Sequence, residues 1–160
     1  TALATAGITY VLVKNLVVSV QRQKRQMSVV LYNKTVSVPC IGLLDSGNLL
    51  TMPLSGNPVH IADAALLQKL VDEKTVQKEI EYRALGNPHG KLQVYCMDGM
   101  KVETEPAKFC DWKQVWVGCA ENGVLCNKPY QLILHASVAD HCGCTKRSIP
   151  NDKKTEKGET

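Results

Sequence analysis

Apolar and polar residues alternate over the first half of the chain. From Ser28, the run "SVVLY" is followed by two polar residues and then by "TVSVPCIGLL", in which Val36, Val38 and Cys40 alternate with Thr, Ser and Pro. Alternation with a period of two predicts strands that bury one face. We therefore expect a β-hairpin that leads directly into Asp45.

Turn signals and helical spacing divide the segments that follow. "PLSGNPV" is rich in Pro and Gly and predicts a turn-rich connection. A short helix is expected to begin at Asp63, a favourable capping residue, because apolar residues then recur at helical spacing. These are Leu66, Leu67, Leu70 and Val71. A second helix is expected over "PYQLILHASV", where Pro129 suits the first helical position.

The second half of the chain also contains strand and turn signals. "Asp98-Gly99" between "VYCM" and "MKVE" predicts a two-residue hairpin turn, and "GNPHG" predicts a looser, accessible loop. A short strand is expected at "QVWVG", followed by a turn at Asn122 and Gly123. Short strands about eight to twelve residues apart suggest a sandwich or barrel. The pattern therefore predicts a mainly β domain with one or two short helices.

The two ends of the chain differ in composition from the middle. Residues 1–13 carry no charge. Since a membrane helix needs roughly 20 apolar residues, they fit either the end of a membrane helix that begins outside this chain or the apolar face of an ordinary helix. The basic cluster "QRQKRQ" follows. It is typical of the cytoplasmic side of a membrane span, and it is equally consistent with a solvated charge run between two elements. We expect a membrane-segment end plus basic linker over 1–26, a folded domain over 27–140 and a disordered polar tail over 141–160.

Charge and cysteine content narrow the function classes. A formal net charge of +4, without a stripe of basic and aromatic residues, does not predict a nucleic-acid surface. The 7 cysteines form an odd number without regular spacing, which favours reduced thiols over a disulfide framework. "HCGC" brings together His141, Cys142 and Cys144, but a zinc site usually needs a second pair of ligands elsewhere. We therefore expect no metal site.

The triplet Asp45, Ser46 and Gly47 follows an apolar run. Alone it is a common turn sequence, but two apolar residues before Asp-Ser/Thr-Gly also mark the catalytic loop of aspartic peptidases. In that chemistry two close carboxylates share one proton. The ionised carboxylate takes a proton from the attacking water, and the protonated one supports the developing oxyanion. Because this chain has a single such triplet, the pair would need Asp45 from two chains on a two-fold axis.

The longer stretch "LLDSGNLLTMPLSGNPVHIAD", with "YRALGNPHGKLQVY", "VWVG" and "YQLILH", resembles the sporulation sigma-E factor-processing peptidases of endospore-forming bacteria. The resemblance covers most of 28–140. It implies a retropepsin-like aspartic peptidase barrel behind several membrane helices, acting as a homodimer without a cofactor on the cytoplasmic side of the mother-cell membrane. It also implies that the substrate is the sigma factor precursor and that a signalling protein from the forespore activates the enzyme.

Carried over to this chain, the resemblance makes Asp45 the catalytic acid and base, with Ser46 and Gly47 completing its loop. Ser46 stands where Thr is commoner, and Met52 stands where Asp is frequent in the family. "ALGNPHGKLQVY" resembles the flap hairpin of retroviral proteases. Its tip would comprise Gly86, Asn87, Pro88, His89 and Gly90.

Two alternatives belong to other function classes. In one, the same β-domain is a noncatalytic partner-binding module and Asp45 is a turn residue. In the other, the tail senses redox state or metal through His141, Cys142 and Cys144. The remaining histidines do not predict a Cys/His peptidase, because no cysteine lies in a nucleophile-like setting. For His60, His89 and His135 we expect surface or packing roles.

Overall fold

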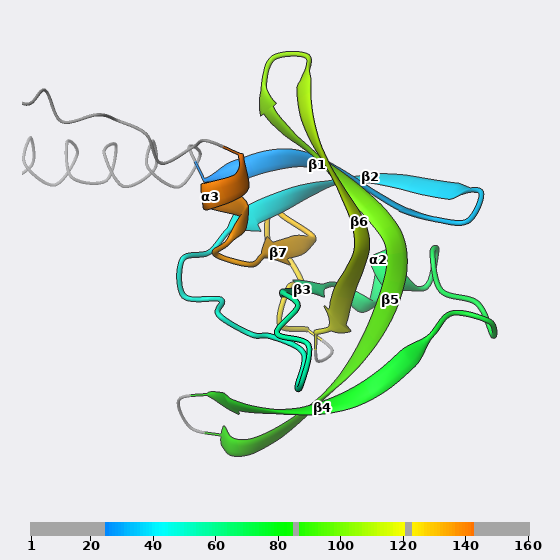
Figure 1. Ribbon diagram of the computed structural model, residues 1–160, viewed down its shortest axis with the longest axis vertical. Coiled ribbons are helices and arrows are strands. Elements are labelled where there is room, and N and C mark those ends of the chain that lie inside the picture. Colours follow the sequence, from blue (N-terminus) through cyan, green and yellow to red (C-terminus); the bar gives the residue numbers. More distant parts are fainter. Residues whose placement is uncertain (1–24, 85–86, 121–122, 143–160) are drawn as a thin grey trace, which may run out of the picture.

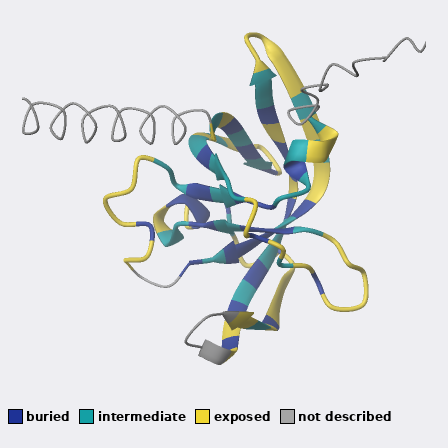
Figure 2. Cartoon of the chain, turned by 90° about the vertical axis from the view of Figure 1, so that its left-hand side faces the viewer, coloured by how far each residue is buried: buried dark blue, intermediate teal, exposed yellow. Residues whose placement is uncertain are grey.

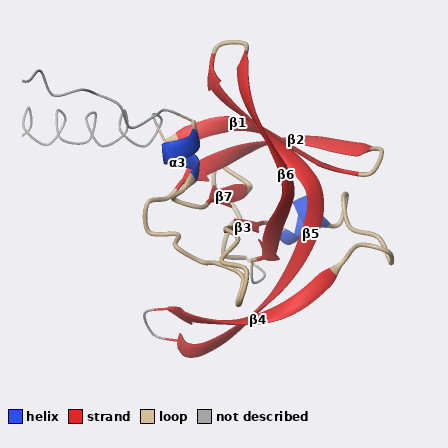
Figure 3. Ribbon diagram, viewed as in Figure 1, coloured by secondary structure: helices blue, strands red, loops and turns tan. Residues whose placement is uncertain are grey.

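The computed structural model describes residues 25–84, 87–120 and 123–142. Strands predominate in these residues, with two short helices (Figures 1 and 3). The mainly β class expected from the sequence is confirmed. The elements are β1 (Gln26–Asn33), β2 (Val36–Leu44), β3 (Val59–Ala62), α2 (Ala64–Leu67), β4 (Gln77–Ala84), β5 (Asn87–Glu105), β6 (Lys108–Cys119), β7 (Leu132–Leu134) and α3 (Val138–His141).

The strands form a closed barrel. Their order in the sheet is β1-β2-β7-β3-β6-β5-β4, and β1 also pairs with β5. This additional pairing closes a ring of β1, β2, β7, β3, β6 and β5. β4 lies outside the ring as an extension of β5, so one of its edges has no strand partner among the described residues (Figure 1).

The predicted β1–β2 hairpin is present. The two strands pair antiparallel from Gln26↔Leu43 to Asn33↔Val36. The turn is made by Lys34, whose φ is 54°, and Thr35. The hairpin delivers the chain to Asp45 at the end of β2, as the alternation predicts.

The barrel encloses the main hydrophobic core, coloured dark blue in Figure 2. Side chains that point inward from the strands fill it, because alternate residues of a strand face the same side. A smaller cluster lies between β3, β4 and β5. The main core includes Val29, Leu31, Met97, Met100, Val102, Val115, Val117, Leu132 and Leu134, and the smaller cluster comprises Met52, Val59, Ile80, Leu92 and Val94.

The expected hairpin turn at Asp98 and Gly99 is wrong. β5 runs through both residues without interruption and pairs with β6 on either side of them, and the chain reverses at 106–107 instead. Gly99 serves a close crossing: a Cβ there would lie 2.3 Å from both the Trp112 carbonyl oxygen and the Tyr32 hydroxyl. The glycine is therefore required by packing across the sheet rather than by a turn.

The expected helix over 129–138 is also wrong. Leu132–Leu134 is strand β7, which pairs parallel with β2 and antiparallel with β3. Leu132 and Leu134 are fully buried, so this short apolar run is a central strand of the kind that sequence periodicity does not distinguish from a buried helix. Only Val138–His141, at the end of the expected segment, is helical.

The predictions of a helix after Asp63 and of a strand at "QVWVG" agree with the structure in their positions. α2 begins at Ala64 with Asp63 as its N-cap residue, although the Asp63 side chain makes no capping hydrogen bond. Leu66 and Leu67 are buried on this helix as predicted, but the helix ends at Leu67, so the expected helical positions Leu70 and Val71 lie beyond it. The expected strand "QVWVG" is part of the longer β6.

The predicted membrane-segment end and most of the predicted tail lie outside the described residues. Within the described part of the chain, no helix is long and apolar enough to span a bilayer. His141, which the sequence assigned to the tail, ends α3, and its ring lies 4.7 Å from that of Trp112.

Replacing Gly99 with Ala tests the crossing of β1, β5 and β6. The new methyl group would overlap the backbone of β6, so the strands must separate, and overpacking of this kind costs roughly 1–3 kcal/mol of unfolding free energy. Urea denaturation of the variant and of Ser28→Ala, an exposed position on β1, measures the cost. Equal midpoints for the two variants would show that the crossing tolerates a side chain.

Candidate active site

Asp45 lies at the point where β2 leaves the barrel. Leu44 is paired with Leu134 of β7, and the Asp45 amide then donates to the Leu134 carbonyl at 3.4 Å. The Asp45 side chain is half-buried. It is therefore attached to the rigid barrel on one side and accessible on the other.

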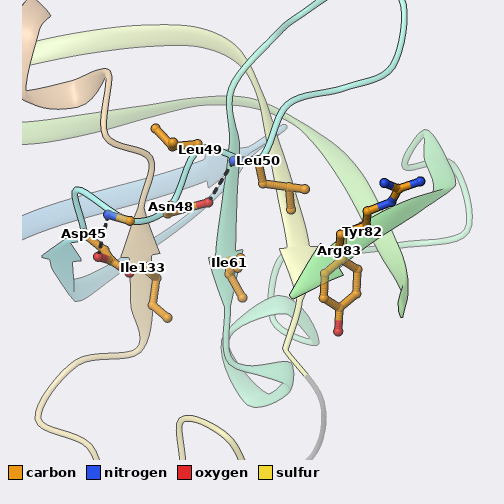
Figure 4. Close-up of a pocket in the computed structure, with 9 residues that line it drawn as sticks. Asp45, Asn48, Leu49, Leu50, Ile61, Tyr82, Arg83 and Ile133 are labelled. Atoms are coloured by element: carbon orange, nitrogen blue, oxygen red, sulfur yellow. Dashed lines mark hydrogen bonds between the residues drawn. The ribbon is translucent and has the colours of Figure 1, made fainter. Parts of the chain in front are cut away.

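The loop after Asp45 folds back onto its carboxylate. The Gly47 amide donates to Asp45 Oδ1 at 2.9 Å, and the Asn48 amide donates to the Asp45 carbonyl at 3.1 Å (Figure 4). A Cβ on Gly47 would lie 3.3 Å from Asp45 Oδ1, so a glycine gives the amide room to approach. Ser46 is exposed at the tip of this turn. The arrangement orients one carboxylate oxygen and leaves the other open.

Asn48 holds the loop against the barrel. It is only 7% exposed, and its side-chain amide donates to the Val59 carbonyl of β3 at 3.1 Å. Its side-chain oxygen accepts from the Leu50 amide at 3.2 Å, and its backbone carbonyl accepts from the Ala136 amide at 3.0 Å. Sequence reasoning did not assign Asn48 this role; the available signal was a polar residue beside an apolar pair.

Two buried histidines lie behind the loop. His60 on β3 is 1% exposed, and its Nδ1 accepts from the His135 amide at 3.1 Å. His135 Nδ1 in turn accepts from the Ser137 amide at 3.0 Å. Since both Nδ1 atoms accept, both rings are neutral with the proton on Nε2. These contacts agree with the packing roles expected for His60 and His135.

Burial makes these two rings hard to protonate. Burial first, and then the neighbouring His135, together lower the pKa of His60 to about 3. Burial also lowers the pKa of His135, and the Leu49 backbone partly opposes this effect. Both histidines therefore support the loop as neutral hydrogen-bonding groups.

A cleft of about 400 Å³ opens beside Asp45. Ile61 and Ile133, which pair across β3 and β7, lie between Asp45 and the β4 residues that form the opposite wall (Figure 4). Among the described residues, Asp45 is the single carboxylate that lines this cleft. The lining residues are Asp45, Gly47, Asn48, Leu49, Leu50, Ile61, Tyr82, Arg83 and Ile133.

The opposite wall of the cleft is formed by strand β4. Tyr82 and Arg83 are successive residues of β4, whose side chains point to opposite faces, yet both line the cleft. The β4–β5 pairing is irregular between Tyr82 and Ala84, and such an irregularity lets successive residues of β4 border one cleft. Because β4 pairs only with β5 among the described residues, its other edge has backbone donors and acceptors that suit an extended peptide.

The segment expected to form a flap lies at the β4–β5 hairpin next to this cleft. Gly86 is outside the described residues, and Asn87, Pro88, His89 and Gly90 are the first residues of β5 rather than a loose loop. Gly90 pairs with Tyr82, and a Cβ on it would lie 2.5 Å from the Tyr82 ring. The hairpin therefore approaches the cleft through the same strand that forms its wall.

The described residues contain no comparable site for cysteine-based catalysis or for metal binding. They contain no group of three or more His, Cys, Asp and Glu side chains that could hold a metal ion, and Cys144 lies outside them. Their cysteines are free thiols. Burial raises the pKa of the Cys40 thiol to about 11, which opposes formation of a thiolate nucleophile.

Comparison with known proteins gives one match. Residues 1–138 match the model of the Peptidase U4 family, described as sporulation factor SpoIIGA. The match spans the Asp45 loop, the β4–β5 hairpin and every described strand. No curated protein and no solved structure matches the chain.

The buried histidines predict a loss of stability in mild acid. The unfolded chain takes up protons near pH 6.5, whereas folded His60 resists protonation down to about pH 3, so the free energy of unfolding falls as the pH decreases below 6.5. The slope from His60 alone is roughly 1 kcal/mol per pH unit. Urea denaturation between pH 6.5 and 5 measures it.

His60→Asn should reduce this slope, because the Asn side chain keeps an acceptor near Nδ1 but does not titrate. Asp72→Asn is the control. The pKa of Asp72 is lowered to about 2, first by its hydrogen bond from Lys34, so its contribution is lost in stronger acid. An unchanged slope in His60→Asn would exclude His60 as the source.

Proposed function

Because this chain belongs to the SpoIIGA family of sporulation peptidases, we propose that it is an aspartic endopeptidase whose catalytic pair is Asp45 from two copies of the chain. One observation carries the proposal. Of the residues that the structure describes, one carboxylate, Asp45, lines the cleft beside the Asp-Ser-Gly loop, and aspartic peptidase chemistry needs two. A homodimer with its two-fold axis beside Asp45 supplies the second, because an interface on the axis presents the same residue twice.

In this mechanism the two Asp45 carboxylates share one proton and hold a water between them. The ionised carboxylate takes a proton from the water as it attacks the peptide carbonyl, and the protonated one hydrogen-bonds to the developing oxyanion. The Gly47 amide holds Asp45 Oδ1 in a fixed direction throughout. No cofactor is required.

The substrate binds as an extended polypeptide between Asp45 and β4. The free edge of β4 supplies backbone hydrogen bonds, and Leu49, Leu50, Ile61 and Ile133 supply apolar contacts to side chains. The β4–β5 hairpin, with Asn87 to Gly90 near its tip, acts as the flap over the bound peptide.

The family match supports a role in sporulation and a protein substrate. We propose that this substrate is a sporulation sigma factor precursor, cleaved near its N-terminus on the cytoplasmic side of the mother-cell membrane. An activating signalling protein then acts through the membrane region that precedes the peptidase domain.

Asp45→Asn tests the catalytic assignment. Co-expression of the membrane-anchored protein with its activator and the sigma factor precursor should show cleavage by the wild type and a loss of about a thousandfold or more in the variant, because Asn cannot share the proton. Asp63→Asn is the matched control, since Asp63 also follows a strand but lies outside the cleft and makes no capping hydrogen bond. Normal processing by Asp45→Asn would favour the noncatalytic binding module.

Co-expression of two differently tagged copies tests the shared site. With equal amounts of wild-type and Asp45→Asn chains that assort at random, about a quarter of the dimers carry two Asp45 carboxylates. The cleavage rate should therefore fall to about a quarter of that of the wild type. A rate near one half would indicate that each chain works independently.

A further inference from the structure

We propose that His60, which does not line the Asp45 cleft, is a positioning residue for Asp45. The inference rests on the proposed function, since it concerns how the same carboxylate is held for catalysis. His60 acts through its Nδ1 atom, which fixes the segment 134–136 against the Asp45 loop.

The Asp45 loop depends on the segment 134–136 at both of its ends. The Asp45 amide donates to the Leu134 carbonyl at 3.4 Å, and the Ala136 amide donates to the Asn48 carbonyl at 3.0 Å. A shift of 134–136 would therefore move the start and the end of the loop together.

The segment 134–136 needs an anchor beyond the end of β7. The antiparallel pairing of β3 with β7 covers Ile61↔Ile133 and Ala62↔Leu132, and β7 ends at Leu134. The next backbone donor of the segment, the His135 amide, is taken by the His60 side chain at 3.1 Å. The imidazole thus continues the connection between β3 and this segment after the strand pairing has stopped.

Adjacent residues of β3 hold the Asp45 loop and the segment 134–136. Asn48 donates to the Val59 carbonyl at 3.1 Å, and His60 accepts from His135. Both side chains are at least nine-tenths buried, with exposures of 7% for Asn48 and 1% for His60. Buried hydrogen bonds of this kind have no water to replace them, so the loss of one leaves an unpaired polar group.

The geometry separates this role from direct catalysis. His60 Nδ1 is occupied as an acceptor, and His60 lines a different cleft of about 260 Å³, together with Asn57, Trp112 and Gln114. A proton relay to Asp45 would need a ring that faces the Asp45 cleft. His60 therefore affects the reaction through the position of the backbone.

A pair of amide substitutions isolates the Nδ1 acceptor. In His60→Asn, the side-chain oxygen takes the place of Nδ1, whereas in His60→Gln it lies one bond further out, near Nε2. Both variants remove the ring and retain an amide. We expect kcat of His60→Asn to stay within about threefold of wild type and kcat of His60→Gln to fall about tenfold to a hundredfold, with KM unchanged, because small misplacements of a catalytic group have effects of this size.

The assay uses the full membrane-anchored protein with its activator and the sigma factor precursor, and rates are expressed per folded dimer. Thermal unfolding of each variant reports the folded fraction. A purely structural role for His60 would lower the stability of both variants without separating their kcat values. Equal kcat values for the two amide variants, or full kcat in folded His60→Gln, would overturn the inference.

Ala136→Pro provides a second route if the His60 variants do not fold. It removes the Ala136 amide that donates to Asn48, at a half-buried position outside the core clusters. The same loss of kcat at unchanged KM is expected, and a folded variant with full kcat would overturn the inference. Asp45→Asn in the same assay tests the proposed function separately, because cleavage by that variant would reject the aspartic mechanism whatever the His60 variants show.

Discussion

The three-residue strand β7 is the connection on which both the barrel and the candidate site depend. It lies between β2 and β3, parallel to one and antiparallel to the other, and thereby joins the two halves of the sheet. Because Leu44 pairs with Leu134, the chain leaves β2 beside the end of β7, and Asp45 emerges next to residues 134–136. The same apolar strand that fills the core therefore determines where the carboxylate lies.

The polar groups around Asp45 are arranged by degree of burial. Asp45 is half-buried and lines the cleft, whereas Asn48, His60 and His135 are buried behind it. The buried groups are held by hydrogen bonds to the backbone of β3 and of the segment after β7. This order suits a site in which one group reacts and the others keep it in place.

Local patterns predicted those elements whose stability is local. The β1–β2 hairpin and α2 follow from alternation, turn residues and helical spacing close together in the sequence. The predictions at Asp98-Gly99 and at Leu132–Leu134 failed because strands that are distant in the sequence determine the local structure there. Long pairing with β6 keeps β5 continuous through a turn-like dipeptide, and pairing with β2 and β3 makes the apolar run after Pro129 a strand.

The sequence by itself determined the mainly β class and singled out Asp45, with its Ser-Gly loop, as the candidate carboxylate, because these depend on residue types and short spacings. Tertiary structure alone decided which groups surround Asp45. Asn48, His60 and residues 134–136 are far apart in the sequence or carry no motif, and they meet only because β3 and β7 pair inside the closed barrel. Hydrogen bonds between distant segments depend on strand register, which the order of residues within one segment does not specify.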